Sequence, residues 1–559
     1  MFIKREQLLA CKDKLTQTPY REFYGDLLEL CESMKAGLPP TVNNLFRARA
    51  FSRFAISLAG MYVLTDDASY AEAAWRITAE NFDRPRWDSE GTAENPIDLS
   101  VGEMAFALSA VKELLGDWID AGKQALLQKA AVRYVFEPYL RAVEGAEKAW
   151  WYRTHINWNP VVNGGVYCLA LCYANVEEMV GRILPLALFG MEAYTDGLHM
   201  DGSCEEGVGY WLYGMMFQTY AMLAYENVTG EKAAFFAHPA AVEGLSFPFD
   251  FSPYGAGISF GDVNWFWPSG GVYAMAARAN RTDIAQKLSQ RLLLARETFA
   301  AEKLFKPETC FMRVSELFGL AFCTVPYDEA AAGAVRQGLK VYPDNGWGLF
   351  GCGDMHLSFR SGNSAVNHGS RNLNSIQLSK NGVTLLRDCA NHPYPDGWFG
   401  EGRQHFIEDM ALSKSTMLVN GVGQMKHGEA DWGYDEIEMY SDITAILPDV
   451  CRKVRRSVSL ENDGFFVRDE FVTKEGKERV WHEIRFVSYG GFTDLGAGRW
   501  ALEAEGERVV LSITADVPLV FDVIQIPASI GVRPSACALR CVTEEASMHT
   551  VIQTLIRAE

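Results

Sequence analysis

Hydrophobic residues recur at three- and four-residue steps from Glu6 to about Cys323. The repeat is clearest in residues 46–64, 104–119, 121–140 and 281–299. Apolar residues at this spacing fall on one face of an α-helix. Gly, Pro and Asp-Gly breaks separate the stretches at intervals that suit successive helical hairpins. The pattern predicts a helical domain, with no repeat sharp enough to indicate a solenoid.

The hydrophobic period changes to two after the junction at residues 324–346. Alternating stretches occupy residues 355–362, 374–388, 416–425, 464–472, 478–488 and 499–515, with Gly or Asn-Gly turns between several of them. Alternation bounded by such turns is typical of antiparallel strands. A run of helices followed by a run of strands predicts an α+β multidomain chain, with a helical domain over 1–330 and an antiparallel β-sandwich over 345–559.

Composition narrows the classes of partner. The chain has 559 residues, enough for two to four domains, and its 52 basic and 71 acidic residues give a net charge of −19. This charge disfavours nucleic acid and an anionic membrane surface as partners. We see no signal-peptide pattern, membrane-length apolar run, C-x-x-C pair, dinucleotide fingerprint or P-loop. We therefore expect a cytoplasmic chain with reduced thiols, although a chain trimmed of a signal would look the same.

Aromatic and amide side chains gather at residues 150–167, just before an apolar helix. The members are Trp150, Trp151, Tyr152, Arg153, His155, Asn157, Trp158, Asn159 and Asn163. Sugar rings stack on aromatic faces while their hydroxyls need amide and charged partners, so the segment suits a carbohydrate cleft. Helix caps combined with surface aromatics are the alternative interpretation.

An acidic turn precedes a second aromatic helix. Asp201, Glu205 and Glu206 lead into a helix headed by Tyr210, and Trp211 begins a stripe that suits core packing. A third polar cluster places Asp262 and Asn264 beside Trp265 and Trp267. Each of these segments alone is a weak indication of a site.

The β half holds a loop system rich in basic residues. His368 and Arg371 precede a strand, Asp388 ends the next strand, and His392, Arg403 and His405 follow. A histidine and two arginines in one loop system favour an anion site. The ten histidines form no H-x-H and no H-E-x-x-H pattern, which disfavours a metal site of either kind.

The helical half resembles the heparinase II/III-like polysaccharide lyases. Their D-G-x-x-x-E-G-x-x-Y-W segment is matched by Asp201, Gly202, Glu206, Gly207, Tyr210 and Trp211. The Asn that opens an earlier family motif matches Asn157, followed by Trp158, and a later Gly of that motif matches Gly165. The resemblance implies an incomplete (α/α) toroid followed by an antiparallel β-sandwich.

The β half carries a second part of the resemblance. The family motif H-N-H-N-D-x-G-S-F aligns with residues 368–376, with Asp388 closing the next strand. Family members with zinc use a second histidine and an H-N-T histidine beside this Asp, but Ser370 and Lys414 stand at those positions. The usual ligand set is thus incomplete. A Lys414–Asp388 ion pair in place of the metal is our hypothesis, and a divalent metal held by Asp388, His392 and His405 is the rival.

The resemblance implies β-elimination across a 4-linked uronic acid, with no organic cofactor. The reaction needs a group that neutralises the uronate carboxylate, a base for the C5 proton and an acid for the O4 leaving group. Asn157 suits the first role, helped by His155 or Asn163. Tyr210 suits the acid, and also the base where both act on one face.

The remaining residues have supporting roles in this interpretation. His368 is the base when the proton leaves from the opposite face, or otherwise a second neutraliser. Arg371 or Arg403 would favour the phenolate of Tyr210. The predicted substrate contacts are His155, Trp158, Asn163, Glu206, Trp211, Arg371, Arg403 and His405.

The expected partner is an acidic oligo- or polysaccharide, with the oligomeric state open. A uronyl C5-epimerase would share the proton abstraction but would reprotonate C5. A glycoside hydrolase would need two facing carboxyl groups, for which Asp201, Glu205, Glu206 and Asp262 are available. A non-catalytic carbohydrate-binding protein is the alternative outside enzymes.

Overall fold

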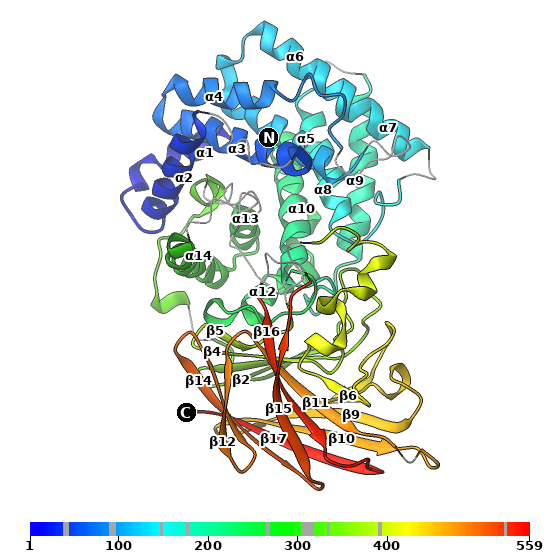
Figure 1. Cartoon of the computed structure of the whole chain (residues 1–559). Coiled ribbons are helices and arrows are strands. Elements are labelled where there is room, and N and C mark those ends of the chain that lie inside the picture. Colours follow the sequence, from blue (N-terminus) through cyan, green and yellow to red (C-terminus); the bar gives the residue numbers. More distant parts are fainter. Residues whose placement is uncertain are drawn as a thin grey trace. The chain divides into compact units, whose positions relative to one another are not determined.

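The computed structural model describes the chain outside residues 37–43, 89–96, 146–148, 175–177, 264–268, 303–316, 333–334, 390–393, 478 and 530–533, and outside the side chains of 44–53, 295–302 and 332. The chain divides into two compact units (Figure 1). The helical unit comprises Met1–Gly202, Trp211–Leu245 and Trp267–Gly333, and the β unit comprises Ser203–Tyr210, Ser246–Phe266 and Ala334–Glu559.

The helical unit confirms the helices expected from the three- and four-residue period. Its described α-helices are α1 (Arg5–Ala10), α2 (Tyr20–Met34), α3 (Asn44–Thr65), α4 (Ala68–Ala79), α5 (Leu99–Leu115), α6 (Ala121–Ala131), α7 (Glu137–Glu144), α8 (Trp158–Leu171), α9 (Val180–Asp196), most of α10 (Val208–Thr229), α11 (Pro239–Gly244), α13 (Gly270–Arg278) and α14 (Thr282–Glu302). None of the described helices is long and apolar enough to span a membrane.

Two glycines let helices α5 and α8 cross at backbone contact. A Cβ on Gly165 would lie 2.0 Å from the carbonyl oxygen of Gly102, and a Cβ on Gly102 would lie 2.5 Å from that of Val161. Real Cβ atoms do not approach this closely, so neither position accepts a side chain without a shift of the backbone. The crossing sets the position of α8, which begins at Trp158 directly after Asn157 and carries Asn159 and Asn163.

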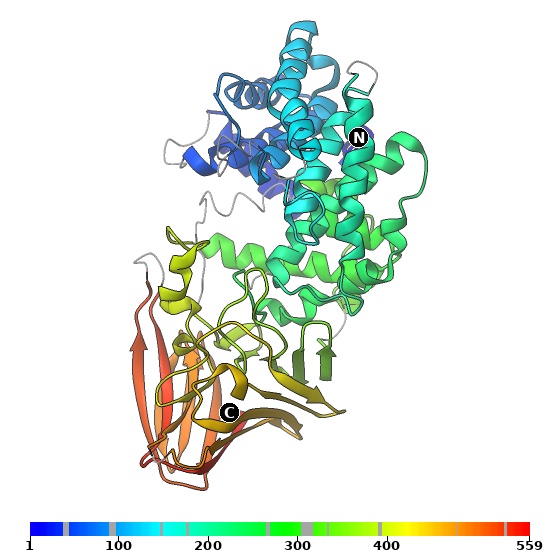
Figure 2. The same ribbon diagram turned by 90° about the vertical axis from the view of Figure 1, so that its right-hand side faces the viewer.

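The β unit contains three antiparallel sheets, which Figure 2 shows from the side. One is β1 (Gly338–Tyr342), β2 (Trp347–Cys352), β3 (Met355–Arg360), β4 (Ile376–Lys380) and β5 (Val383–Leu386), in that order. The largest has the order β12 (Gly491–Gly496), β13 (Arg499–Ala504), β14 (Glu507–Ala515), β17 (His549–Ala558), β10 (Gly464–Thr473), β9 (Cys451–Glu461), β8 (Glu438–Asp442) and β7 (Asp431–Tyr434). The third is β15 (Leu519–Ile526), β16 (Ala536–Thr543), β11 (His482–Ser488) and β6 (Met417–Val419).

One hydrophobic core joins the three sheets. It is built by the inward positions of the alternating strands, for example Phe350 on β2, Val467 on β10 and Ile484 on β11, all fully buried. Alternation along β10 places one face in this core and leaves the other partly exposed. The antiparallel sandwich expected from the period of two is confirmed.

A buried ion pair ties the largest sheet to the loops beneath it. Arg456 on β9 lies opposite Asp469 on β10, and the two side chains are fully buried with Nε and Oδ1 2.6 Å apart. The same guanidinium donates to the carbonyl oxygens of Asn374 and Ser415. Asn374 and Ser415 are the chain neighbours of Ser375 and Lys414, so the pair anchors the loop system of the predicted site.

Candidate active site

Two chain segments of the β unit, Ser203–Tyr210 and Ser246–Phe266, meet at two glycine turns. Gly207, with φ +91°, would place a Cβ 2.2 Å from the carbonyl oxygen of Phe260. Gly261, with φ +97°, would place a Cβ 2.4 Å from the carbonyl oxygen of Glu206. Only glycine accepts both the left-handed conformation and this contact. The turns therefore bring Glu206 and Asp262 together and start α10 with Tyr210 in its first turn.

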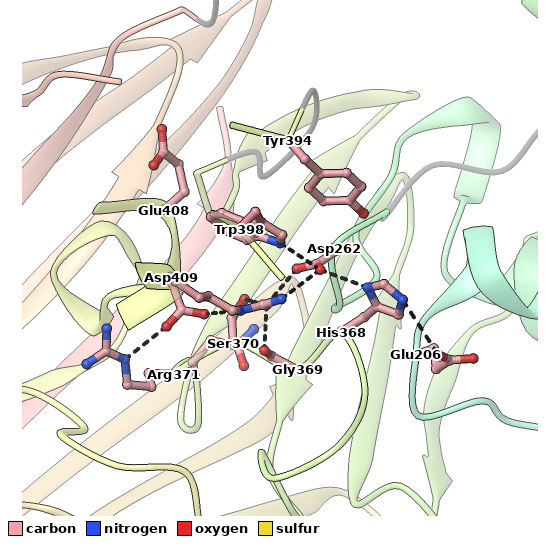
Figure 3. A network of polar contacts seen from close by, with 12 residues as sticks. Glu206, Asp262, His368, Gly369, Ser370, Arg371, Tyr394, Trp398, Glu408 and Asp409 are labelled. Atoms are coloured by element: carbon pink, nitrogen blue, oxygen red, sulfur yellow. Dashed lines mark hydrogen bonds and ion pairs between the residues drawn. The ribbon is translucent and has the colours of Figure 1, made fainter. Parts of the chain in front are cut away.

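His368 lies between these two carboxylates, as Figure 3 shows. Its Nδ1 is 2.9 Å from Oδ2 of Asp262, and its Nε2 is 3.7 Å from Oε1 of Glu206. The His368 backbone has φ 56°, a strained conformation for a residue with a side chain. The surrounding contacts hold the imidazole in this position, which is the expected context for a functional histidine.

Tyr210 stacks on the imidazole of His368. The ring centroids are 3.7 Å apart and the planes differ by 14°. The Tyr210 hydroxyl is 2.8 Å from the hydroxyl of Tyr394. Burial, together with the nearby Tyr210 and Asp262, raises the pKa of Tyr394 well above its ordinary value. The Tyr394 hydroxyl therefore stays protonated, and either hydroxyl can be the donor while both carry their protons.

The two predicted arginines bind carboxylates of the same unit. Arg403 donates from Nη1 and Nη2 to the two oxygens of Asp262 at 2.9 and 2.8 Å, and from Nε to Asp409 at 2.9 Å. Arg371 donates from Nε to the other oxygen of Asp409 at 3.1 Å. Burial alone would raise the pKa of Asp262, but the His368 hydrogen bond and the Arg403 charge hold it below its ordinary value.

Both arginines are engaged within the β unit. Their charges are balanced by Asp262 and Asp409, which are both buried, so the hydrogen bonds described for Arg371 and Arg403 serve the network itself. The hydroxyl of Tyr210 instead faces Tyr394. Contact of the two arginines with a substrate anion stays a prediction.

Two adjacent aromatic residues complete the cluster. Trp398 is buried and donates from Nε1 to Oδ2 of Asp262 at 3.1 Å, and the Arg403 guanidinium lies 4.5 Å from the centre of its ring. Phe399 is 68% exposed, although its ring meets those of Tyr394 and His368 at centroid distances of 4.8 and 5.8 Å. An exposed ring beside a histidine offers a surface on which a sugar can stack.

The predicted site residues of the helical unit differ in burial and in contacts. Asn157 is buried at the start of α8 and makes no side-chain cap hydrogen bond, which disfavours the capping alternative for it. Trp158 is half-buried and packs against the exposed Trp150, with ring centroids 4.8 Å apart. His155 is exposed. Their contribution to binding stays a prediction.

Two of the predicted contact residues, Asn163 and Trp211, are buried. Asn163 is fully buried, and its amide bonds to the Tyr139 hydroxyl, the Tyr152 carbonyl and the Asn159 side chain, so these bonds give it a structural role. Trp211 is 2% exposed, which leaves almost no ring surface for a sugar. The packing-stripe interpretation of Trp211 is favoured.

The region expected to hold zinc in relatives contains a lysine ammonium. Lys414 and Asp388 are both buried, and Nζ of Lys414 lies 4.0 Å from Oδ2 of Asp388. Ser375 and Asn372 donate to the two Asp388 oxygens at 2.5 and 3.1 Å. A cationic side chain this close to the carboxylate disfavours a divalent ion at the same oxygens. The residues present therefore do not fit the zinc of the resemblance.

The rival metal site is only partly described. His392 lies outside the described residues. His405 is exposed at the end of a short 3-10 helix, and among the described side chains neither it nor Asp388 belongs to a group of three metal-ligating residues. Asn264, Trp265 and Trp267 of the third polar cluster also lie outside the described residues, whereas its Asp262 is central to the site.

Comparison of the sequence with family models and with curated proteins finds no match. Solved structures do match. Heparinase III has a TM-score of 0.60 at 12% identity, covering 91% of this chain and 76% of that one. The heparan sulfate lyase HepC from Pedobacter heparinus has 0.56 at 12%, covering 93% and 78%. The chondroitin AC lyase of Streptomyces coelicolor A3, in complex with chondroitin sulphate, has 0.55 at 11%, covering 99% and 82%.

These likenesses show the fold of this chain. It is the polysaccharide lyase fold, a helical toroid followed by an antiparallel β-sandwich. Fold alone does not assign chemistry, because one fold hosts different activities. The function has to be argued from the site.

Proposed function

We propose that this protein is a polysaccharide or oligosaccharide lyase that cleaves a 4-linked uronic-acid glycan by β-elimination. The observation that carries the proposal is the stack of Tyr210 on His368, with the Tyr210 hydroxyl bonded to Tyr394. Two groups able to move a proton thus lie side by side in the β unit. The lyase fold supports the same reaction class.

Tyr210 is the proton-transfer group in the proposed reaction. As a phenolate it would take the C5 proton, and as a phenol it would protonate O4 on departure. Tyr394 retains its own proton because of its raised pKa, so it can donate a hydrogen bond to the Tyr210 phenolate. This supplies the stabilisation that was first expected from Arg371 or Arg403.

His368 is the second reacting group. It takes the C5 proton if base and leaving group lie on opposite faces, and otherwise contacts the uronate carboxylate. The role of Asn157 as the group that neutralises this carboxylate stays a prediction from the sequence. The proposed mechanism routes no step through a zinc ion at Asp388, since Lys414 lies beside this carboxylate.

The paired arginines also bear on the substrate. A sulfate group needs a cation whose charge is not already balanced, and Arg371 and Arg403 are both bound to buried aspartates. We therefore propose an unsulfated or sparsely sulfated uronan, with the exposed Phe399 stacking on one of its sugar rings.

The test is ultraviolet absorbance of the unsaturated product. The purified protein is offered sulfated and unsulfated forms of several uronans. We expect absorbance to rise, mostly on unsulfated chains, and to fall by about 10²-fold or more in Tyr210→Phe and His368→Ala. Tyr434→Phe is the matched control, because Tyr434 is a half-exposed tyrosine on β7 of the same unit.

Other outcomes would redirect the assignment. Deuterium exchange at C5 without absorbance would indicate the epimerase. Binding without either signal would indicate a carbohydrate-binding protein. An absorbance rise that survives in both variants would refute the roles given to Tyr210 and His368.

A further inference from the structure

We propose that Asp262 is a positioning residue that fixes the tautomer and orientation of His368, so that Nε2 is the nitrogen that exchanges a proton. The inference rests on the proposed lyase function. It starts from the 2.9 Å contact between Nδ1 of His368 and Oδ2 of Asp262. An ionised carboxylate only accepts hydrogen bonds, so Nδ1 must carry the hydrogen. The neutral imidazole then has its lone pair on Nε2.

Several contacts besides the hydrogen bond from His368 hold Asp262 in place. Its side chain is fully buried, and Oδ2 accepts from His368, from Nε1 of Trp398 and from Nη1 of Arg403. Its Oδ1 accepts from Nη2 of Arg403. The fork of Arg403 fixes the plane of the carboxylate, since rotation would break both of its bonds. The acceptor offered to His368 therefore has a fixed direction.

The imidazole is constrained in a second dimension by Tyr210. The bond to Asp262 fixes the direction of Nδ1, and the 14° stacking on Tyr210 fixes the plane of the ring. Nε2 then faces Glu206 at 3.7 Å, a separation slightly beyond a direct hydrogen bond. Figure 3 shows His368 in this position between the two acids. Glu206 is thus the carboxylate nearest to the reacting nitrogen.

The pattern explains why Asp262 is compatible with a site for an anionic substrate. Asp262 acts through His368, and its charge is balanced by Arg403. Orientation of a catalytic histidine by a buried carboxylate contributes to the rate, since the wrong tautomer presents a hydrogen where the base needs a lone pair. Asp409 offers a natural comparison, because it also binds Arg403 but bonds to Arg371 where Asp262 bonds to His368.

The experiment compares three variants of the full-length protein. Asp262→Ala removes the acceptor of Nδ1. Asp262→Asn keeps an acceptor, because the amide oxygen favours the position that meets three donors, but it removes the charge. Asp409→Ala removes the other carboxylate partner of Arg403 and is the matched control. Nitrogen-15 NMR of labelled histidine reports the tautomer, with the His368 signal assigned by its loss in His368→Gln.

We expect the neutral imidazole of His368 to be the Nδ1–H tautomer in the wild type, Asp262→Asn and Asp409→Ala, and this preference to be lost in Asp262→Ala. On turnover, kcat of Asp262→Ala should fall by about 10²-fold or more with KM changed by less than about threefold, and Asp262→Asn should recover part of kcat. The kcat of Asp409→Ala should fall less than that of Asp262→Ala.

Two results would overturn the inference. One is an Nε2–H tautomer in the wild type, a result that does not depend on the folding of the Asp262 variants. The other is Asp262→Ala with an unchanged tautomer and a kcat equal to that of Asp409→Ala. The NMR signal does not require turnover. A protein inactive on every uronan but with the expected tautomer would refute the proposed function, whereas an active protein with the other tautomer would refute the role of Asp262.

Discussion

Replacing Lys414 with methionine should destabilise the β unit strongly. The ammonium is 1% exposed and lies 4.0 Å from the Asp388 carboxylate, which is also buried. At an effective dielectric constant of about 20, two charges at this separation attract by about 4 kcal/mol. The variant leaves Asp388 without its counter-charge and removes the donor to the Glu408 carbonyl oxygen. Hydrogen bonds from Ser375 and Asn372 still support Asp388, so we expect a loss of about 3 kcal/mol.

The assay is urea unfolding of a double-mutant cycle. The single variants Lys414→Met and Asp388→Asn are combined in a double variant, and the coupling free energy should be about 2–4 kcal/mol. Lys453→Met is the control for loss of a lysine. Nζ of Lys453 lies 3.0 Å from Oε1 of Glu470, but the Lys453 side chain is 31% exposed. The variant should therefore lose less than about 1 kcal/mol of unfolding free energy.

A chelator arm separates the ion pair from a metal. If Lys414 takes the place of zinc, EDTA leaves the unfolding midpoint of the wild type unchanged. Additive single variants, or a wild type destabilised by EDTA, would refute the reasoning. The second result would direct attention to the rival site around Asp388, His392 and His405.

Three further predictions concern acid stability and the site. His482 is buried, and burial lowers its pKa to about 4, so below pH 6.5 the unfolded state takes up a proton before the folded state does. The free energy of unfolding should therefore fall by about 3 kcal/mol between pH 6.5 and 4. Urea midpoints measured against pH should lose this slope in His482→Gln. Tyr394→Phe removes the donor to Tyr210 and should lower kcat by about tenfold or more, with a wild-type kcat contradicting its role. Phe399→Ala should raise KM by about three- to tenfold at constant kcat, and Phe399→Trp should restore it, as initial rates will show.

The change of hydrophobic period predicted the fold because element type is a local property. Three- and four-residue steps before Cys323 and alternation after Trp347 depend only on which face of an element is buried. The strands begin at Gly338, inside the stretch expected to join the two domains. The three-sheet order is not local: β10 pairs with β17 across a long stretch of chain. No repeat in the sequence predicts that pairing.

The site was predicted only in part for the same reason. Tyr210, His368 and Glu206 are brought together, as their motifs implied. Asp262 stood in a weak cluster, and its partners Trp398 and Arg403 are more than a hundred residues away. Tyr394 lacked any motif, although the aromatic residues of its glycine-rich loop were a signal. The sequence shows that Arg403 is charged, but it does not show which carboxylates neutralise that charge.

The β unit is assembled from separate segments of the chain, which limits where the chain can be cut without breaking the site. Glu206 and Tyr210 come from Ser203–Tyr210, and Asp262 comes from Ser246–Phe266, although both segments are embedded in the helical half of the sequence. A gene cut once before Ala334 would separate His368 from all three. Recombination that exchanges whole domains between relatives would thus tend to break this cluster, and its two halves are expected to have been inherited together.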